Sequence, residues 1–109
     1  VNVKALKAFD RPAIYAASQE GHATLVRTLA ELKADVDATQ SDRTSSVYVA
    51  SQQGHVDVVK ALAEIKANIN APDRDGTSPA HIASLRGHVA VVEALAAFKA
   101  DLNAADSDG

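Results

Sequence analysis

Histidine is the residue type in this 109-residue chain with the clearest potential for chemistry. Three of the four histidines, His22, His55 and His88, follow a glycine at intervals of 33 residues. A zinc site needs three or four ligands around one ion, and side chains separated by so long and regular an interval are too far apart to share one. We expect no metal site. We interpret these histidines, and His81 with them, as structural residues that tie successive turns together.

No catalytic pattern is present in the remaining polar residues. The chain has no cysteine, which excludes disulfides and thiolate chemistry, and no Gly-x-Ser-x-Gly turn or phosphate-binding loop occurs. The acidic pairs Asp35 with Asp37 and Asp73 with Asp75 stand among turn-forming residues, which favours a role in turns over acid–base catalysis. We therefore predict no enzyme activity, no catalytic residue and no cofactor.

Composition and charge narrow the class of partner. The net charge is -3 and the basic residues are scattered, whereas a nucleic-acid surface needs clustered Lys and Arg. No apolar run is long enough for a membrane span, and no signal-peptide pattern is seen. We expect no nucleic-acid partner and no membrane. The absence of cysteine is compatible with a reducing compartment, and we expect an intracellular, cytoplasmic location.

The elements that would position these residues follow from an internal repeat. The interval that relates the Gly-His pairs also relates other positions, namely Lys33-Ala34, Lys66-Ala67 and Lys99-Ala100, and the leucines Leu29, Leu62 and Leu95. A fixed period of this size is the signature of a stacked repeat protein, in which each unit buries its apolar face against its neighbours.

Specific motifs within the repeat resemble a known family. Residues 76–83 read Gly-Thr-Ser-Pro-Ala-His-Ile-Ala, a Gly-His pair separates two helical patterns, and residues 100–104 read Ala-Asp-Leu-Asn-Ala. With the period of 33 residues, these motifs resemble the ankyrin repeat over essentially the whole chain. The resemblance implies an all-α solenoid of stacked helix-turn-helix units with projecting hairpin-like turns. It also implies that the chain binds other proteins.

The repeat register divides the chain. We expect one domain over residues 1–109, with a partial repeat at 1–8, repeats at about 9–41, 42–74 and 75–107, and the start of a further repeat at 108–109. Neither end shows the polar face of a capping repeat. The expected outcomes are fraying of the ends or end-to-end self-association between copies of the chain.

The apolar pattern predicts six helices. Their expected ranges are 13–19, 23–32, 46–52, 56–65, 79–85 and 89–98. The second helix of each repeat should bury one apolar face, made in turn by Leu25, Leu29 and Leu32, by Val58, Val59, Leu62 and Ile65, and by Val91, Val92, Leu95 and Phe98. The segments 37–43, 70–76 and 103–109 are rich in turn-forming residues and should project from one edge.

Two features depart from the family pattern. Lys33, Lys66 and Lys99 stand where a glycine usually follows the second helix, and each should cost about 1 kcal/mol if the backbone there is left-handed. Such a lysine column could attract an acidic peptide, but Asp35, Asp37 and Asp101 stand close by, which favours a solvated edge. Tyr15 and Tyr48 replace the motif histidine of His81, so the usual Thr–His hydrogen bonding cannot form in those repeats as the family makes it.

The resemblance places partner binding on the turn tips and the concave helix face. The candidate residues differ among the three copies while the packing positions agree; they are Phe9, Arg11, Gln19, Glu20, Asp42, Thr44, Gln52, Gln53, Arg74, Asp75, Thr77, Leu85 and Arg86. Phe9, Arg11, Leu85 and Arg86 should contribute most, because aromatic and Arg side chains dominate interface energies.

Different functions remain open at this point. A structural spacer or an engineered repeat scaffold without a natural partner is the alternative to a protein-binding module. The absence of Met, Cys and Trp and the uniform lysines favour that alternative, while the divergent first repeat opposes it. The repeats could also target an enzyme or channel encoded elsewhere in a longer chain.

Overall fold

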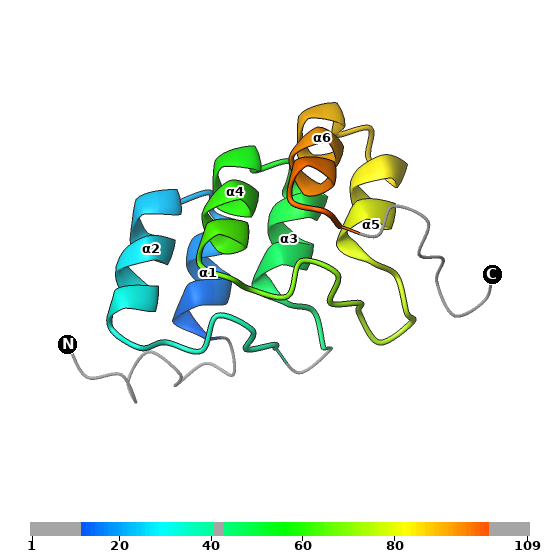
Figure 1. Ribbon diagram of the computed structural model, residues 1–109. Helices are drawn as coiled ribbons and strands as arrows, with labels where there is room; N and C mark the ends of the chain where they lie inside the picture. The colour runs from blue at the N-terminus through cyan, green and yellow to red at the C-terminus, as the bar shows by residue number, and fades with distance from the viewer. Residues whose placement is uncertain (1–11, 41–42, 101–109) are drawn as a thin grey trace.

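Three stacked helix pairs make up the described part of the chain. The structure, a computed structural model, describes residues 12–40 and 43–100. Its helices are α1 (Ala13–Gln19), α2 (Ala23–Glu31), α3 (Ser46–Gln53), α4 (Val56–Glu64), α5 (Pro79–Leu85) and α6 (Val89–Ala97). Helices α1, α3 and α5 contact one another in one layer, and α2, α4 and α6 form the other (Figure 1). The predicted all-α solenoid is confirmed for these residues.

A left-handed glycine ends the first helix of each pair. Gly21, Gly54 and Gly87 have φ of 82°, 79° and 73°. At the end of α3, the Gly54 N–H donates to the Ser51 carbonyl at 3.3 Å and the His55 N–H donates to the Ala50 carbonyl at 2.9 Å. This pair of bonds satisfies carbonyls that a helix end leaves without partners, and it requires the positive φ that glycine adopts without strain. The chain then reverses into the second helix.

The second helix of each pair ends in the same way, but on lysine. Lys33, Lys66 and Lys99 have φ of 72°, 70° and 70°. After α4, the Lys66 N–H donates to the Ala63 carbonyl at 3.1 Å, and the next N–H donates to the Leu62 carbonyl at 3.0 Å. The expected left-handed backbone is therefore confirmed. All three lysine side chains are exposed, and each retains the strain of a Cβ in this conformation.

Four predicted helix ends are wrong by one residue. Leu32, Ile65 and Phe98 were expected to close their helices, but each lies just beyond the helix, with ψ between 12° and 15°. The reason is the left-handed lysine that follows, because it turns the chain out of the helix one residue earlier. In contrast, α3 continues to Gln53, one residue beyond its predicted end.

The core consists of small side chains between the two layers. Its largest fully buried members are Ile14, Val26, Val47, Val58, Val59, Leu62, Val91 and Leu95. Small residues suit this position because two short helices must approach closely for each repeat to cover the next. The middle repeat is the most enclosed, since every residue from 44 to 51 is buried.

The predicted apolar faces need three corrections. In α2 the buried residues are Val26 and Leu29, whereas Leu25 is 45% exposed and Leu32 is 55% exposed. The residue of α4 that matches Leu25 is Val58, which is buried against its neighbours. No described helix packs on that side of α2 (Figure 1). Phe98, predicted to face inward, is 37% exposed beyond the end of α6.

Candidate recognition surface

Two projecting turns make the same pair of backbone hydrogen bonds. We call residues 39–45 the first turn, of which 41–42 lie outside the described residues, and residues 72–78 the second turn. In the first, the Gln40 N–H donates to the Thr44 carbonyl at 3.1 Å and the Arg43 N–H donates to the Gln40 carbonyl at 2.9 Å. In the second, Asp73 and Gly76 make the matching bonds, both at 3.0 Å. The two turns differ in their residues and not in these backbone bonds.

The residue types that hold the two turns are different. In the second turn, the Asp73 carboxylate accepts the backbone N–H groups of Asp75 and Thr77 at 2.9 and 3.0 Å. Gly76 supplies the left-handed position, with φ of 83°. The first turn has Gln40 in place of the aspartate and Arg43, with φ of 70°, in place of the glycine. Its backbone is closed instead by an antiparallel bridge between Thr39 and Ser45.

The structure separates the predicted partner-binding residues into classes of exposure. Glu20, Gln53, Arg74, Asp75, Leu85 and Arg86 are exposed, Gln19, Gln52 and Thr77 are half-buried, and Thr44 is buried. Phe9, Arg11 and Asp42 lie outside the described residues. The described members therefore leave nine side chains with at least part of their surface open to a partner.

Thr44 has a packing role in the fold. Its side chain is 8% exposed, and its hydroxyl donates to the Tyr15 hydroxyl at 3.2 Å across two repeats. Tyr15 stands at the position of His81 in the third repeat, so this contact between hydroxyls takes the place of the Thr–His bonding expected of the family. Because the Thr44 side chain is enclosed and paired, we leave it out of the recognition surface.

The open residues form two rows. The tip row, on the projecting turns, consists of Arg43, Arg74, Asp75 and Thr77, and the end row, at the carboxyl ends of α1, α3 and α5, consists of Gln19, Glu20, Gln52, Gln53, Leu85 and Arg86. In Figure 1 the turns lie along the lower edge of the stack and the helix ends lie at the upper edge. A helix of seven or eight residues separates the rows by about 11 Å. We call the two rows together the recognition surface.

Two histidines contact the backbone of the end row at Gln19 and Gln52. The Nε2 atom of His55 lies 3.0 Å from the Gln19 carbonyl oxygen, and that of His88 lies 3.0 Å from the Gln52 carbonyl oxygen. Because a carbonyl oxygen only accepts, each ring nitrogen carries a proton and donates. The interpretation that a histidine ties one repeat to the next is confirmed for these two. No three metal-ligating side chains come together within residues 12–40 and 43–100.

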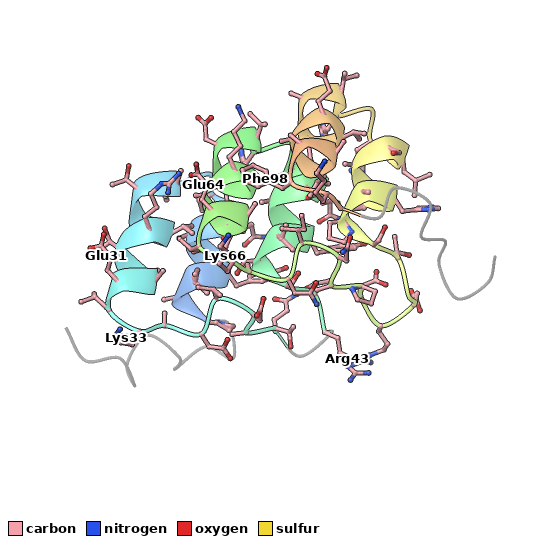
Figure 2. The ribbon with its side chains drawn as sticks, in the orientation of Figure 1. Glu31, Lys33, Arg43, Glu64, Lys66 and Phe98 are labelled. Atoms are coloured by element: carbon pink, nitrogen blue, oxygen red, sulfur yellow. The ribbon has the colours of Figure 1, made fainter. Side chains whose placement is uncertain are left out.

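The outer layer carries a different set of charges. Arg27 on α2 forms an ion pair with Glu64 on α4, and both side chains are about half exposed. Figure 2 labels Glu64. The Asp37 carboxylate accepts the backbone N–H of Asn68, in the next repeat, at 2.7 Å. These contacts join neighbouring repeats. Lys33, Lys66 and Lys99 lie just beyond the carboxyl ends of α2, α4 and α6 and are exposed, as at a solvated edge.

Arg43 is a candidate residue that the sequence prediction omitted. It is exposed, and Figure 2 shows its side chain extending from the projecting edge away from the helices. The 33-residue offset from Gly76 was the available signal, because it marks Arg43 as a bulky residue at a glycine position. Comparing the two turns residue by residue would have found it.

Comparison with known sequences identifies a family. The sequence model of ankyrin repeats matches residues 3–106 in three copies. No curated protein sequence matches the chain. In the described part of the structure, no helix has the length and apolar character needed to cross a bilayer.

Proposed function

The chain belongs to the ankyrin repeat family, and from this premise we propose that it binds a partner protein through the recognition surface, without catalysis. Ankyrin repeats are generally protein–protein interaction modules. The proposal assigns binding to the tip row and the end row, which lie on one layer of helices and its turns. The outer layer of α2, α4 and α6, in which Arg27 pairs with Glu64, is not part of the proposed surface.

The observation that carries the proposal is a contrast between equivalent positions. Ala17, Ala50 and Ala83 match one another in the three repeats and are all buried. Two and three residues later, the matching pairs read Gln19-Glu20, Gln52-Gln53 and Leu85-Arg86, which have only the first glutamine of two repeats in common. Packing holds the buried positions alike, whereas the exposed ones are free to be fitted to a partner. The same backbone therefore presents different side chains along one edge.

Leu85 and Arg86 are the most distinctive pair in the end row. Leu85 is 68% exposed, and the exposed Arg86 follows it directly. The matching residues in the other repeats are glutamine and glutamate. Leu85 and Arg86 are therefore the one apolar residue and the one cation of the end row. Burying an exposed leucine removes apolar surface from water, and Arg is enriched among residues that dominate interface energies. We expect this pair to contribute the largest share of end-row binding.

End-to-end self-association is less well supported than binding of another protein. Arg27 pairs with Glu64 in the next repeat. One repeat further along, the positions that match Arg27 and Glu64 are Lys60 and Ala97. If a second copy stacked on the third repeat in the same way, the matching positions would be Glu93 of one copy and Glu31 of the other. Like charges at such a contact repel. Repulsion between these two glutamates thus opposes head-to-tail stacking. Self-association is not part of the proposed function.

Capture of partners from a cell lysate tests the proposal. The unaltered chain would be compared with a variant in which Gln53, Leu85 and Arg86 are changed to alanine. The matched control changes Lys60, Lys66 and Glu93 on the outer layer to alanine. Circular dichroism would confirm that both variants stay helical. We expect a captured protein to be lost with the first variant and kept with the control.

The opposite pattern would contradict the proposal. Loss of the partner with the outer-layer control, and retention with the end-row variant, would place binding on α2, α4 and α6. Failure of all three proteins to capture anything would favour the structural spacer or scaffold instead.

A further inference from the structure

Arg43 holds an exposed side chain on a strained backbone. Its φ of 70° lies in the left-handed region, where a Cβ crowds the following carbonyl. The second turn makes the same backbone bonds and has Gly76 at the matching position, so the conformation belongs to the turn and not to the arginine. A glycine would form the first turn with less strain. The arginine therefore needs a reason other than the stability of the fold.

The two residues that follow Arg43 fix the position of its backbone. Thr44 is buried and bonded to Tyr15. Ser45 is buried too, and its hydroxyl accepts the Tyr48 N–H at 3.1 Å, which caps α3. The Arg43 backbone is thus anchored directly to the core on its carboxyl side. A long, charged side chain on a fixed base loses less freedom on binding than one on a loose loop.

Arg43 has no ion pair within the described part of the chain, where the one salt bridge is between Arg27 and Glu64. Its guanidinium presents several N–H donors in a planar fork that matches a carboxylate in two hydrogen bonds. Because the guanidinium is exposed and has no such partner among residues 12–40 and 43–100, it is available to an incoming carboxylate.

The charge around Arg43 favours an acidic partner. The whole chain carries a net charge of -3. On the recognition surface, however, the described charges are three arginines, Arg43, Arg74 and Arg86, against the two acids Glu20 and Asp75. The nearby Asp73 carboxylate already accepts two N–H groups of its own turn. Counted in this way, the recognition surface carries one more positive than negative charge, whereas the whole chain has a net charge of -3.

We propose that Arg43 anchors an acidic segment of the partner protein. Its guanidinium would donate hydrogen bonds to an Asp or Glu carboxylate of that segment. This inference rests on the proposed function, and it adds the chemical class of the partner. It also explains why a strained arginine occupies a glycine position in the first turn. Removing it should strengthen the fold and weaken binding.

The test uses a displayed library of random peptides as the probe and the unaltered chain as the target. Selected peptides are sequenced, and the dissociation constants of the tightest are measured for the chain and for Arg43→Gly, Arg43→Lys and Lys66→Gly. Lys66→Gly is the matched control, because it removes one positive charge and one left-handed Cβ from the outer layer. Thermal melts are recorded for every variant.

We expect the selected peptides to be enriched in Asp and Glu. Arg43→Gly should melt several degrees higher than the unaltered chain and bind these peptides at least about tenfold more weakly. Arg43→Lys should bind with intermediate affinity, since it keeps the charge and loses the planar fork. Lys66→Gly should also melt higher, and its affinity should stay within about twofold.

Failure of this inference can be told apart from failure of the proposed function. Peptides without acidic enrichment, or equal affinity for Arg43→Gly and Lys66→Gly, would overturn the role of Arg43. If those peptides still lost affinity when Leu85 and Arg86 were changed to alanine, the proposed surface would stand. Recovery of no binding peptide, or of peptides insensitive to changes in both rows, would contradict both.

Discussion

The second and third repeats have the same backbone and are stabilised in different ways. The helices of the second repeat, α3 and α4, are covered on both sides, and α3 is buried along most of its length. Yet this repeat begins with the strained Arg43 and has two buried serine hydroxyls, on Ser46 and Ser51, that make no hydrogen bond among the described residues. Its stability comes from its neighbours more than from its own sequence.

The third repeat shows the reverse. Its turn has Gly76 at the left-handed position and Asp73 to accept two N–H groups, and Pro79 opens α5. It is less enclosed, since Leu85 and Val89 are 68% and 69% exposed. A repeat covered on both sides thus tolerates locally unfavourable residues, whereas one with less cover relies on its turn and cap residues.

The largest expected difference between the two repeats is at the interhelix glycines. A Cβ on Gly54 would lie 2.9 Å from the Cε1 and Nδ1 atoms of His88, and the His88 ring is held by its bond to the Gln52 carbonyl. A Cβ on Gly87 would meet nothing within 4 Å. Gly54→Ala should therefore lower the free energy of unfolding by about 2–3 kcal/mol and Gly87→Ala by about 1 kcal/mol. Urea denaturation of both variants measures this. Equal losses would mean that the histidine moves aside without cost.

The turns should respond next most strongly. Asp73→Ala leaves the N–H groups of Asp75 and Thr77 without their carboxylate acceptor, and we expect it to cost about 1–2 kcal/mol of unfolding free energy. Gln40→Ala, at the matching position of the first turn, should change stability by less than about 0.5 kcal/mol. The pair can be compared by thermal melts. A larger loss for Gln40→Ala than for Asp73→Ala would show that the Gln40 side chain stabilises its turn more than the Asp73 side chain does.

Two serines at matching positions test the cost of an unpaired hydroxyl in the buried helix α3. The Ser51 hydroxyl is buried with no hydrogen-bond partner among the described residues, whereas the Ser84 hydroxyl donates to the Ala80 carbonyl at 2.8 Å. Ser51→Ala should stabilise the fold by about 1 kcal/mol, because it removes an unpaired buried polar group. Ser84→Ala should be close to neutral. Denaturant midpoints decide between them, and a destabilising Ser51→Ala would indicate that its hydroxyl is hydrogen-bonded in solution.

The smallest expected effect concerns the lysine column. Lys66→Gly relieves a left-handed Cβ, and we expect a gain of about 0.5–1 kcal/mol, seen as a rise of a few degrees in the melting temperature. Part of the gain is offset because a cation near a helix carboxyl end is favourable. An unchanged or lower melting temperature would argue against strain at this position.

Much of the fold could be predicted from the sequence, because the 33-residue repeat fixes it in three copies. Gly54 and His55 located a helix end and a contact between repeats from their spacing alone. The side of a helix that a neighbouring repeat buries could not be predicted from this spacing. Leu25 and Val58 occupy matching positions, yet one is exposed and the other buried, since burial depends on the neighbouring repeat.

The candidate site was predicted less completely, for local reasons. Thr44 was expected to be open to a partner, but Tyr15 reaches it from the preceding repeat, a contact between residues 29 positions apart. Arg43 was overlooked because arginine gives no sign of a left-handed backbone by itself. Only its alignment with Gly76 reveals the strain. Side chains that meet across repeats, and residues that oppose the local backbone, are what single-sequence patterns describe least well.

The most direct test of the central claim is an NMR titration of the isotopically labelled chain with a selected acidic peptide. We predict that backbone amide shifts will change in the tip row and the end row, most strongly at Arg43, Arg74, Leu85 and Arg86. Amides near Glu64 and Lys66 on the outer layer should stay unchanged. Shift changes concentrated on α2, α4 and α6, with none at the projecting turns, would contradict it.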